Sequence, residues 1–395
     1  DGYDDAQTLE SNRVLIIDKI SPTITGAVNT SPNFRRYQNF TANITISDDV
    51  ALDYYIFSTN ASGTWTNIST VDISGAVYSA SEQANISTAR GSQVCWLYYA
   101  NDTSGNMANS SVNCFTVANT LPTHTTPILN STNPATNDTN QNLTAYNISS
   151  ADIDGDSIKS IFNWEVNGTP IAVLNMPFEQ LNGTGGVNGN ARDYSGKGNN
   201  GSVSGAVWNA TGGYDGKGVY MLDGINDALS IADNASIDFE NSDFSIILWL
   251  KSAHTTPSAV ERLLFKRDGS SGYDLYLNAG GVLNTYLDDT RFTGVTISSG
   301  TVVTGLHDGA WHHLGAVIKY YNDTYVNYSL FKDGAFVASG LYNARNLSNT
   351  GALLIGTSGA SNYFNGTIDE LIIFNRSLSA QQINALYNNR TDLIV

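Results

Sequence analysis

The amino-acid sequence predicts an all-β protein. Short apolar segments recur at regular spacing, and clusters of Ser, Asn, Gly and Thr separate them. Strong helix formers are sparse, whereas Asn, Thr, Ser, Gly and Tyr are abundant and only 14% of the residues are charged. A chain of 395 residues, 41% of them apolar, can bury several cores, so we expect two to three domains.

The charge balance argues against two classes of partner. The chain has 19 basic and 36 acidic residues, a net charge of −17 at pH 7. We therefore expect no binding to nucleic acid or to an anionic membrane surface. No apolar run approaches the roughly 20 residues that a membrane-spanning helix needs. Because the first residue is Asp, we expect a mature chain whose signal peptide has been removed.

The first predicted strand has no neighbour in the sequence with which to pair. Residues 12–18 (NRVLIID) are apolar and β-branched, but no strand precedes them, and a complete sandwich begins only after Ser21-Pro22. We interpret residues 1–19 as an unpaired N-terminal segment that donates a strand to another sheet. The residues of this predicted donor strand are Val14, Leu15, Ile16 and Ile17.

Residues 20–118 are predicted to form a closed β-sandwich. Its strands include 40–46, 52–57, 93–99 and 112–117. Short strands at this spacing are typical of an immunoglobulin-like fold. The stretches 21–25 (SPTIT), 48–52 (DDVAL) and 101–106 (NDTSGN) resemble those of bacterial and archaeal immunoglobulin-like surface repeats.

The two cysteines of the chain, Cys95 and Cys114, lie symmetrically about the predicted turn at 101–106. A hairpin there would bring them face to face. We expect a disulfide rather than free thiols, in keeping with an extracellular location. A zinc site is excluded because no further ligands lie nearby in the sequence.

Residues 119–172 are predicted to form an incomplete immunoglobulin-like sandwich. Strands near 126–129, 143–148 and 161–166 are too few to close one. Leu393-Ile394-Val395 begins another apolar strand, so we expect the sandwich to resume at 390–395. Its sheet would still need a strand from elsewhere.

From residue 173 to residue 389 the pattern changes. The stretches that stand out are 193–201 (DYSGKGNNG), 222–227 (LDGIND), 244–250 (FSIILWL), 309–314 (GAWHHL), 331–334 (FKDG), 366–371 (GTIDEL) and 377–383 (SLSAQQI). In this order they resemble a LamG-like jelly roll of the concanavalin A-like class. In similar surface proteins such a domain lies in a loop of an immunoglobulin-like domain, which implies that the jelly roll is inserted in the incomplete sandwich. Independently, Ser379 and Gln382 predict a capping box, and Ile383, Leu386 and Tyr387 form one apolar helical face.

Glycosylation acceptors predict an extracellular surface protein. About half of the asparagines stand in Asn-x-Ser/Thr, whereas chance would place roughly one in five there. In 39–46 (NFTANITI) the apolar residues alternate with the acceptors, which puts Asn39 and Asn43 on the outer face. The alternative is chance richness in Asn, Ser and Thr. The predicted glycosylation sites are Asn39, Asn43, Asn60, Asn67, Asn85, Asn101, Asn130, Asn142, Asn147, Asn167, Asn200, Asn209, Asn322, Asn346 and Asn365.

Two groups of acidic residues are candidates for calcium. Asp152, Asp154 and Asp156 alternate around a Gly turn, as oxygen ligands of a hard cation do, although Asn163 stands where an EF-hand needs Glu. An acidic turn between strands is the alternative. The second group follows from the LamG resemblance, and its members could equally cap turns. It comprises Asp193, Asp223, Asp227 and Asp369.

Because the sequence contains no recognisable catalytic motif, we predict that the protein is not an enzyme. Concanavalin A-like glucanases need two carboxylates that share one cleft, but Asp369 and Glu370 are adjacent and should point to opposite faces of a strand. No nucleophile elbow, phosphate loop or His-rich metal spacing occurs. Carbohydrate binding is a separate hypothesis, for which aromatic rings would offer stacking faces, and burial in the core is the alternative. These rings belong to Tyr273, Tyr276, Tyr286, Trp311, Tyr320 and Tyr321.

These expectations combine into one predicted function and one alternative. The predicted function is a glycosylated structural subunit of a filament or surface layer outside the cell, in which the donor strand of one copy completes the sheet of the next, head to tail. The alternative is a lectin-like adhesion module of a longer cell-surface protein. Calcium is the only cofactor that we expect.

Overall fold

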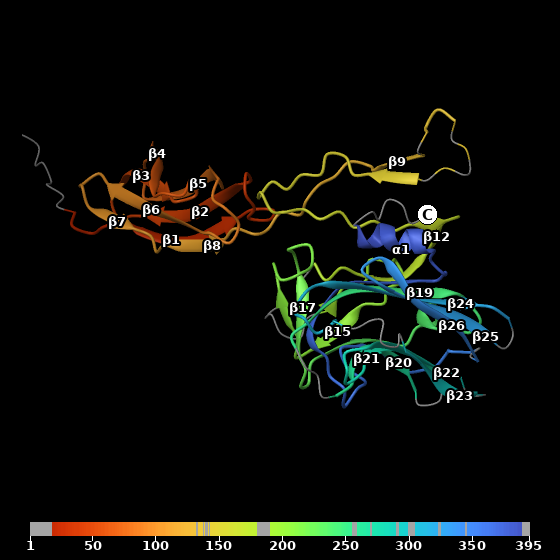
Figure 1. The fold of residues 1–395 in the computed structure, drawn as a ribbon. Coiled ribbons are helices and arrows are strands. Elements are labelled where there is room, and N and C mark those ends of the chain that lie inside the picture. The colour runs from red at the N-terminus through yellow and green to blue at the C-terminus, as the bar shows by residue number, and fades with distance from the viewer. Residues whose placement is uncertain are drawn as a thin grey trace, which may run out of the picture. The chain divides into compact units, whose positions relative to one another are not determined.

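The computed structural model describes residues 18–388, apart from 132, 137, 139–140, 142, 180–189, 255–258, 269–270, 290–291, 299–304, 323–324 and 344–345. Nearly all regular secondary structure in the described chain is β-strand, which confirms the predicted fold class. It divides into two compact units (Figure 1). One comprises residues up to 128 together with 147–159, and the other comprises 129–146 together with the residues from 160 onward.

The first unit contains a closed sandwich of two antiparallel sheets. One sheet has the order β1 (Thr23–Thr30), β2 (Asn39–Ser47), β5 (Val77–Asn85). The other has the order β4 (Thr66–Asp72), β3 (Leu52–Thr59), β6 (Gln93–Asp102), β7 (Met107–Asn109), and β8 (Asn113–Thr116) also pairs with β6. Alternate residues of β2 are buried, as the sequence predicts. Phe40, Phe57, Trp96 and Tyr98 fill the core between the sheets, and the Tyr98 hydroxyl donates to the carbonyl of Ala42 across it.

The predicted disulfide forms within this sandwich. The register of β6 with β8 places Cys95 directly opposite Cys114. Their Cα atoms are 4.1 Å apart, and their sulfur atoms are bonded. The bond therefore ties the last strand of the sandwich to its central strand.

The second unit contains a jelly roll built from two larger sheets. One sheet has the order β16 (Val207–Asn209), β17 (Val219–Asp223), β28 (Asn365–Phe374), β19 (Phe244–Ser252), β24 (His312–Tyr320), β25 (Tyr325–Lys332), β26 (Ala335–Asn343), with β13 (Ala172–Met176) also paired to β28. We call it the helix-side sheet. The other has the order β14 (Asn190–Ala191), β15 (Gly201–Ser204), β18 (Ala228–Ile231), β27 (Leu353–Ile355), β20 (Glu261–Arg267), β21 (Gly272–Leu277), β22 (Leu283–Asp289), β23 (Phe292–Ser298). We call it the open sheet.

Side chains from both sheets form one large core, and a short 3-10 helix (Ala235–Ile237) adds Ile237 to it. The one α-helix among the described residues, α1 (Ala380–Tyr387), lies on the outer side of the helix-side sheet (Figure 1). It begins with the predicted capping box of Ser379 and Gln382, and Ile383 and Leu386 pack against that sheet. No helix in the described part of the chain has the length and apolar character needed to cross a membrane.

Residues 118–170, which we call the linking segment, differ from both sandwiches. They contain the ribbon of β9 (Ile128–Ser131) with β10 (Leu143–Tyr146) and the two-residue strands β11 (Glu165–Val166) and β12 (Thr169–Pro170). The strand predicted at 161–166 is therefore reduced to its last two residues. No described residue of the linking segment is buried. Its exposed large apolar side chains are Leu121, Ile128, Leu129, Tyr146, Ile153 and Val166.

Candidate functional site

The outer face of the open sheet presents arginine and aromatic side chains together. The strand register aligns Phe265, Asp274 and Tyr286 in one row across β20, β21 and β22. In the rows on either side, Arg262 pairs with Tyr276, and Arg267 pairs with Gly272. The alternate residues of these strands, among them Tyr273 and Leu275, point into the core. We call this set of Arg262, Phe265, Arg267, Tyr276 and Tyr286 the arginine–tyrosine face.

Each arginine of this face lies over a tyrosine ring. The guanidinium carbon of Arg262 is 4.3 Å from the ring centre of Tyr276, and that of Arg267 is 4.2 Å from the ring centre of Tyr286. Such stacking is favoured by the attraction between a cation and the ring face. The two arginine side chains are 16% and 17% exposed, so a small part of each remains at the surface, while the Nε atoms of both are buried.

Buried carboxylates hold the two arginines in place. Arg262 forms an ion pair with Asp274, whose side chain is fully buried, and Arg267 Nη2 lies 2.5 Å from Asp288 Oδ2. The backbone N–H of Tyr286 donates to Asp274 Oδ1 at 3.0 Å. Burial raises the pKa of Asp274 to about 7, although the charges of Arg262 and Arg267 act in the opposite direction. The result is a rigid surface that combines ring faces with hydrogen-bond donors.

The aromatic residues predicted for stacking divide into three groups. Tyr273 is fully buried, and its hydroxyl donates to the carbonyl of Ile237, so the prediction of a stacking face was wrong for this residue and the core alternative holds. Tyr276 and Tyr286 belong to the arginine–tyrosine face, but Tyr276 is buried at 9% exposure beneath Arg262, whereas Tyr286 is partly exposed. Trp311, Tyr320 and Tyr321 lie outside the open sheet, at the start of β24, at its end and in the loop that follows.

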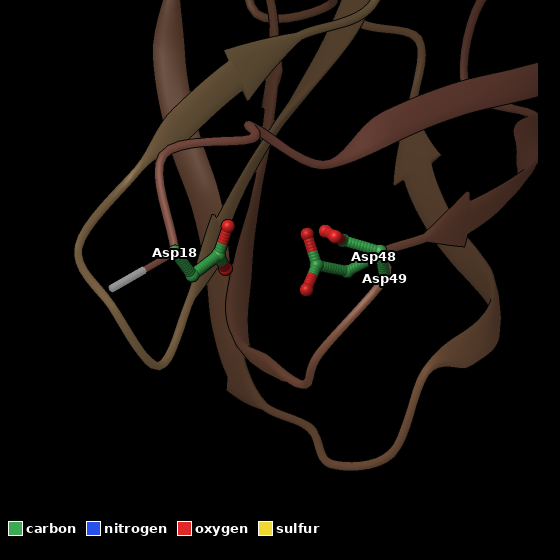
Figure 2. A group of neighbouring side chains, drawn as sticks. All are labelled: Asp18, Asp48 and Asp49. Atoms are coloured by element: carbon green, nitrogen blue, oxygen red, sulfur yellow. The ribbon is translucent and has the colours of Figure 1, made fainter. Parts of the chain in front are cut away.

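A second candidate site lies in the first sandwich, where Asp18, Asp48 and Asp49 bring carboxylate oxygens within 4.8 Å of one another. Figure 2 shows these carboxylates turned toward a shared space. Asp48 Oδ1 accepts from the backbone N–H groups of Val50 and Ala51, which fixes the turn after β2. The other oxygens, Asp18 Oδ2 and Asp48 Oδ2, are buried without a hydrogen-bond partner in the described chain. Carboxylates in this arrangement are suited to a hard cation such as calcium.

The calcium residues predicted from the sequence do not gather in this way. Asp152 Oδ1 accepts from the N–H groups of Asp154 and Asp156, while Asp156 forms an ion pair with Arg90 at 2.9 Å. Asp154 accepts from the N–H of Thr120. In the described chain the three carboxylates are thus engaged in a turn, although Asp154 Oδ1 is buried without a hydrogen-bond partner there, and calcium at this turn stays a prediction.

The second predicted calcium set is distributed over several turns of the jelly roll. Asp193 is buried and accepts from the N–H groups of Asn175, Ser195 and Asn199. Asp223 accepts from two N–H groups of its own turn, and Asp227 accepts from the N–H of Asp223. Asp369 accepts from the N–H of Tyr214. These contacts are those of turn-capping carboxylates, which is the alternative that the sequence left open.

A third acidic group, Glu179, Asp215 and Glu370, also has carboxylate oxygens within 4.8 Å of one another. Each of its members has a further interaction partner, and Glu179 Oε2 accepts from the N–H of Gly218. No sequence pattern predicts this group, because its residues come from three distant segments.

The predicted glycosylation sites are all accessible to some degree where the structure describes them. Asn142 lies outside the described residues, and none of the other predicted acceptors is buried. The amide of Asn60 is engaged, because its Oδ1 accepts from the N–H of Cys95 and its Nδ2 donates to the carbonyl of Gln93. Asn39 and Asn85 face each other across β2 and β5, with Asn85 Nδ2 donating to Asn39 Oδ1 at 3.1 Å. Attachment of glycans stays a prediction.

Two further predictions lie outside the described residues. They concern the donor strand of Val14, Leu15, Ile16 and Ile17 and the resumed sandwich at 390–395. The bounds of the predicted domains likewise stay predictions.

Comparison with solved structures gives distant similarities. The chain is similar to the binding domain of Paraclostridial Mosquitocidal Protein 1, with 19% identity and a TM-score of 0.45 over 55% of this chain and 52% of that chain. It is also similar to the receptor binding domain of botulinum neurotoxin D, with 17% identity and a TM-score of 0.42 over 56% of this chain and 53% of that chain. The matched part therefore spans about half the length of these structures. No protein with a curated description matches the sequence.

Comparison with protein families gives a direct match. Residues 223–384 match the family described as the concanavalin A-like lectin/glucanases superfamily. This range runs from the end of β17 into α1 and includes most strands of both large sheets. The chain therefore carries a jelly-roll domain of the concanavalin A-like lectin/glucanase superfamily.

Proposed function

We propose that the jelly roll is a non-enzymatic carbohydrate-binding module of an extracellular surface protein. The observation that carries the proposal is the arginine–tyrosine face. Sugars bind proteins through ring faces that stack on their apolar side and through donors and acceptors that meet their hydroxyl groups, and this face offers both. Its position supports the proposal, because α1 covers the outer side of the other sheet.

A glycan array probed with the full chain tests this function. Tyr286→Ala should reduce binding at least about tenfold, because it removes one ring and releases the guanidinium group of Arg267 that lies on it. Tyr321→Ala is the matched control, since Tyr321 is 66% exposed and lies in the loop after β24. The proposal fails if the wild-type chain binds no glycan, or if the two variants behave alike.

A second proposed function is self-assembly by strand addition, and the linking segment favours it. A segment with exposed apolar side chains and a two-stranded ribbon offers both a surface and open strand edges to an added strand. The occupant that we propose is the apolar stretch Val14 to Ile17 of a second copy. Repetition of this contact would give an open fibre.

Removal of residues 1–17 tests this assembly. We expect the wild-type chain to form fibres in a concentration-dependent manner, and the truncated chain to stay monomeric with both sandwiches folded. A synthetic peptide of residues 9–18, added in excess, should block assembly of the wild type by occupying the same edge. Fibres from the truncated chain, or a wild type that stays monomeric at high concentration, would contradict strand addition.

A further inference from the structure

Four segments of the jelly roll bring a set of polar side chains together. Ser252 ends β19, Glu261 begins β20, His307 precedes β24 and Asn365 begins β28. The side chains of Glu261 and His307 are 3% and 7% exposed, so they are almost completely removed from water. His254, two residues after Ser252, is 44% exposed and connects this set with the surface.

The contacts of Ser252 are compatible with a tautomer of His307 that leaves Nε2 without a proton. The Ser252 hydroxyl lies 3.3 Å from the carbonyl of His254 and 2.7 Å from His307 Nδ1, and the direction of the second hydrogen bond depends on the tautomer. When the hydroxyl donates to the carbonyl of His254, it accepts from Nδ1–H of His307. In this tautomer, His307 Nε2 of the neutral ring carries a lone pair.

This lone pair faces another acceptor. His307 Nε2 lies 3.6 Å from Glu261 Oε2, and neither atom has a hydrogen-bond partner in the described part of the chain. Two buried acceptors that face each other are unfavourable, because both lose hydration and gain nothing in return. A cation between them would satisfy both.

The 3.6 Å distance fits a metal ion. With metal–nitrogen and metal–oxygen bonds of about 2.1 Å and tetrahedral angles, two ligand atoms of one zinc ion are about 3.4 Å apart. Imidazole nitrogen combined with carboxylate oxygen is a donor set that suits zinc and similar transition metals. The bond from His307 Nδ1 to Ser252 is the outer contact that orients a metal-binding histidine.

We propose that Glu261 and His307 bind a zinc-class transition-metal ion, with His254 as the third protein ligand. His254 Nδ1 lies 2.7 Å from Glu261 Oε1, and His254 Nε2 lies 3.2 Å from Asn365 Nδ2. Asn365 donates to Nε2 in this arrangement, so Nδ1 carries the proton that it gives to Glu261. To bind the ion, His254 turns toward His307 and releases this proton. The site is independent of the proposed carbohydrate function.

Titration of the full chain with Co²⁺ and Zn²⁺ tests the proposal. After treatment with EDTA, and with excess Mg²⁺ to occupy weak carboxylate sites, we expect one Co²⁺ per chain with visible absorption typical of low coordination number. We also expect a higher melting temperature with Zn²⁺, and heats of binding that differ between buffers because a proton is released.

Variants assign the ligands. Glu261→Gln and His307→Gln should weaken binding by more than the roughly 10- to 100-fold that loss of an outer contact costs, and Ser252→Ala should weaken it by about that amount without altering the Co²⁺ spectrum. His254→Ala alters an exposed side chain, so it reports on binding even if the buried variants fail to fold. His124→Ala is the control, because His124 is exposed and its Nδ1 lies 2.9 Å from the carbonyl oxygen of the adjacent Thr125. Absence of saturable binding, or equal affinity in His254→Ala and wild type, would overturn the proposal.

Discussion

The first sandwich and the linking segment contain similar residues, yet only the first encloses a core. Both alternate apolar residues with Asn, Ser and Thr. In the first sandwich two sheets face each other and bury Phe40, Phe57 and Trp96 completely. In its described residues the linking segment has only two-stranded ribbons, and none of these residues is buried, although Trp164 packs against the apolar cluster on the helix-side sheet. Apolar alternation therefore specifies a strand face, whereas a core also requires a second sheet to cover that face.

A pair of identical substitutions tests this contrast, and it has the largest expected effect. Leu52 is 1% exposed in the first sandwich, and Leu129 is 55% exposed in β9. Leu52→Ala should reduce the free energy of unfolding by about 2–5 kcal/mol, whereas Leu129→Ala should change it by less than about 0.5 kcal/mol in the monomer. Denaturant titration of both variants measures the difference. A large loss with Leu129→Ala would mean that something covers the linking segment.

The two closed cores should also differ in their response to acid. Burial lowers the pKa of His313 in the jelly roll to about 4, while no histidine lies between residues 18 and 118. The unfolded chain therefore binds more protons than the folded chain between pH 6.5 and pH 4, and the stability of the jelly roll falls as the pH decreases through this range. Protonation of His313 should lower the free energy of unfolding by roughly 3 kcal/mol over this range.

His313→Phe should remove this part of the pH dependence. Both ring nitrogens of His313 lack hydrogen-bond partners in the described chain, and the ring packs near Trp249 and Tyr387, so phenylalanine loses no polar contact. Thermal unfolding at pH 7, 5.5 and 4 measures the effect. His124→Ala is the control and should keep the wild-type dependence. If His313→Phe keeps it too, protonation of His313 does not destabilise the fold.

Reduction of the disulfide should destabilise the first sandwich alone. Cys95 and Cys114 are 19 residues apart in sequence. A disulfide that closes a loop of this size adds about 2–4 kcal/mol to the free energy of unfolding, because it restricts the unfolded chain. We expect the double variant Cys95→Ala/Cys114→Ala to lower the unfolding midpoint of the first sandwich and to leave that of the jelly roll unchanged. Calorimetry with and without reductant resolves the two transitions. A shift in both would mean that the two units unfold together.

Calcium should have the smallest effect. At a free concentration a few times its dissociation constant, calcium should raise the free energy of unfolding of the first unit by about 1 kcal/mol. If Asp18, Asp48 and Asp49 hold the ion, Asp48→Asn should abolish the shift in melting temperature between calcium and EDTA. Asp152→Asn tests the turn that the sequence predicts instead. Loss of the shift in Asp152→Asn alone would favour that turn, and no shift in the wild type would argue against both sites.

The sequence predicted the parts of the fold that depend on local patterns. The alternation in 39–46 fixed the buried face of β2, and Ser379 with Gln382 fixed the start of α1, because both signals lie within a few residues. The register of Cys95 with Cys114 followed from their symmetry about one turn. The strand at 161–166 was shortened, because apolar residues alone do not supply a partner strand.

The candidate sites were largely invisible in the sequence because they join distant segments. Asp18 meets Asp48 and Asp49 only when the chain before β1 folds next to the turn after β2. Tyr276 and Tyr286 were singled out as aromatic residues, but their arginine partners lie on other positions of the sheet and depend on its register. Alternation along β21 places Tyr273 with Leu275 and Leu277 on the core side, a local signal that the sequence interpretation did not use.

The neighbouring ends of the jelly roll have a mechanical consequence. β13 and β28 are antiparallel with Ala172 opposite Phe374, and the N–H of Asn375 donates to the carbonyl of Ile171. Tension applied at Ile171 and Asn375 would thus pull perpendicular to this strand pair and open its hydrogen bonds one after another, rather than shear them all at once. The strand pair β13–β28 should therefore separate at low force, while the other strand pairs of both sheets stay intact.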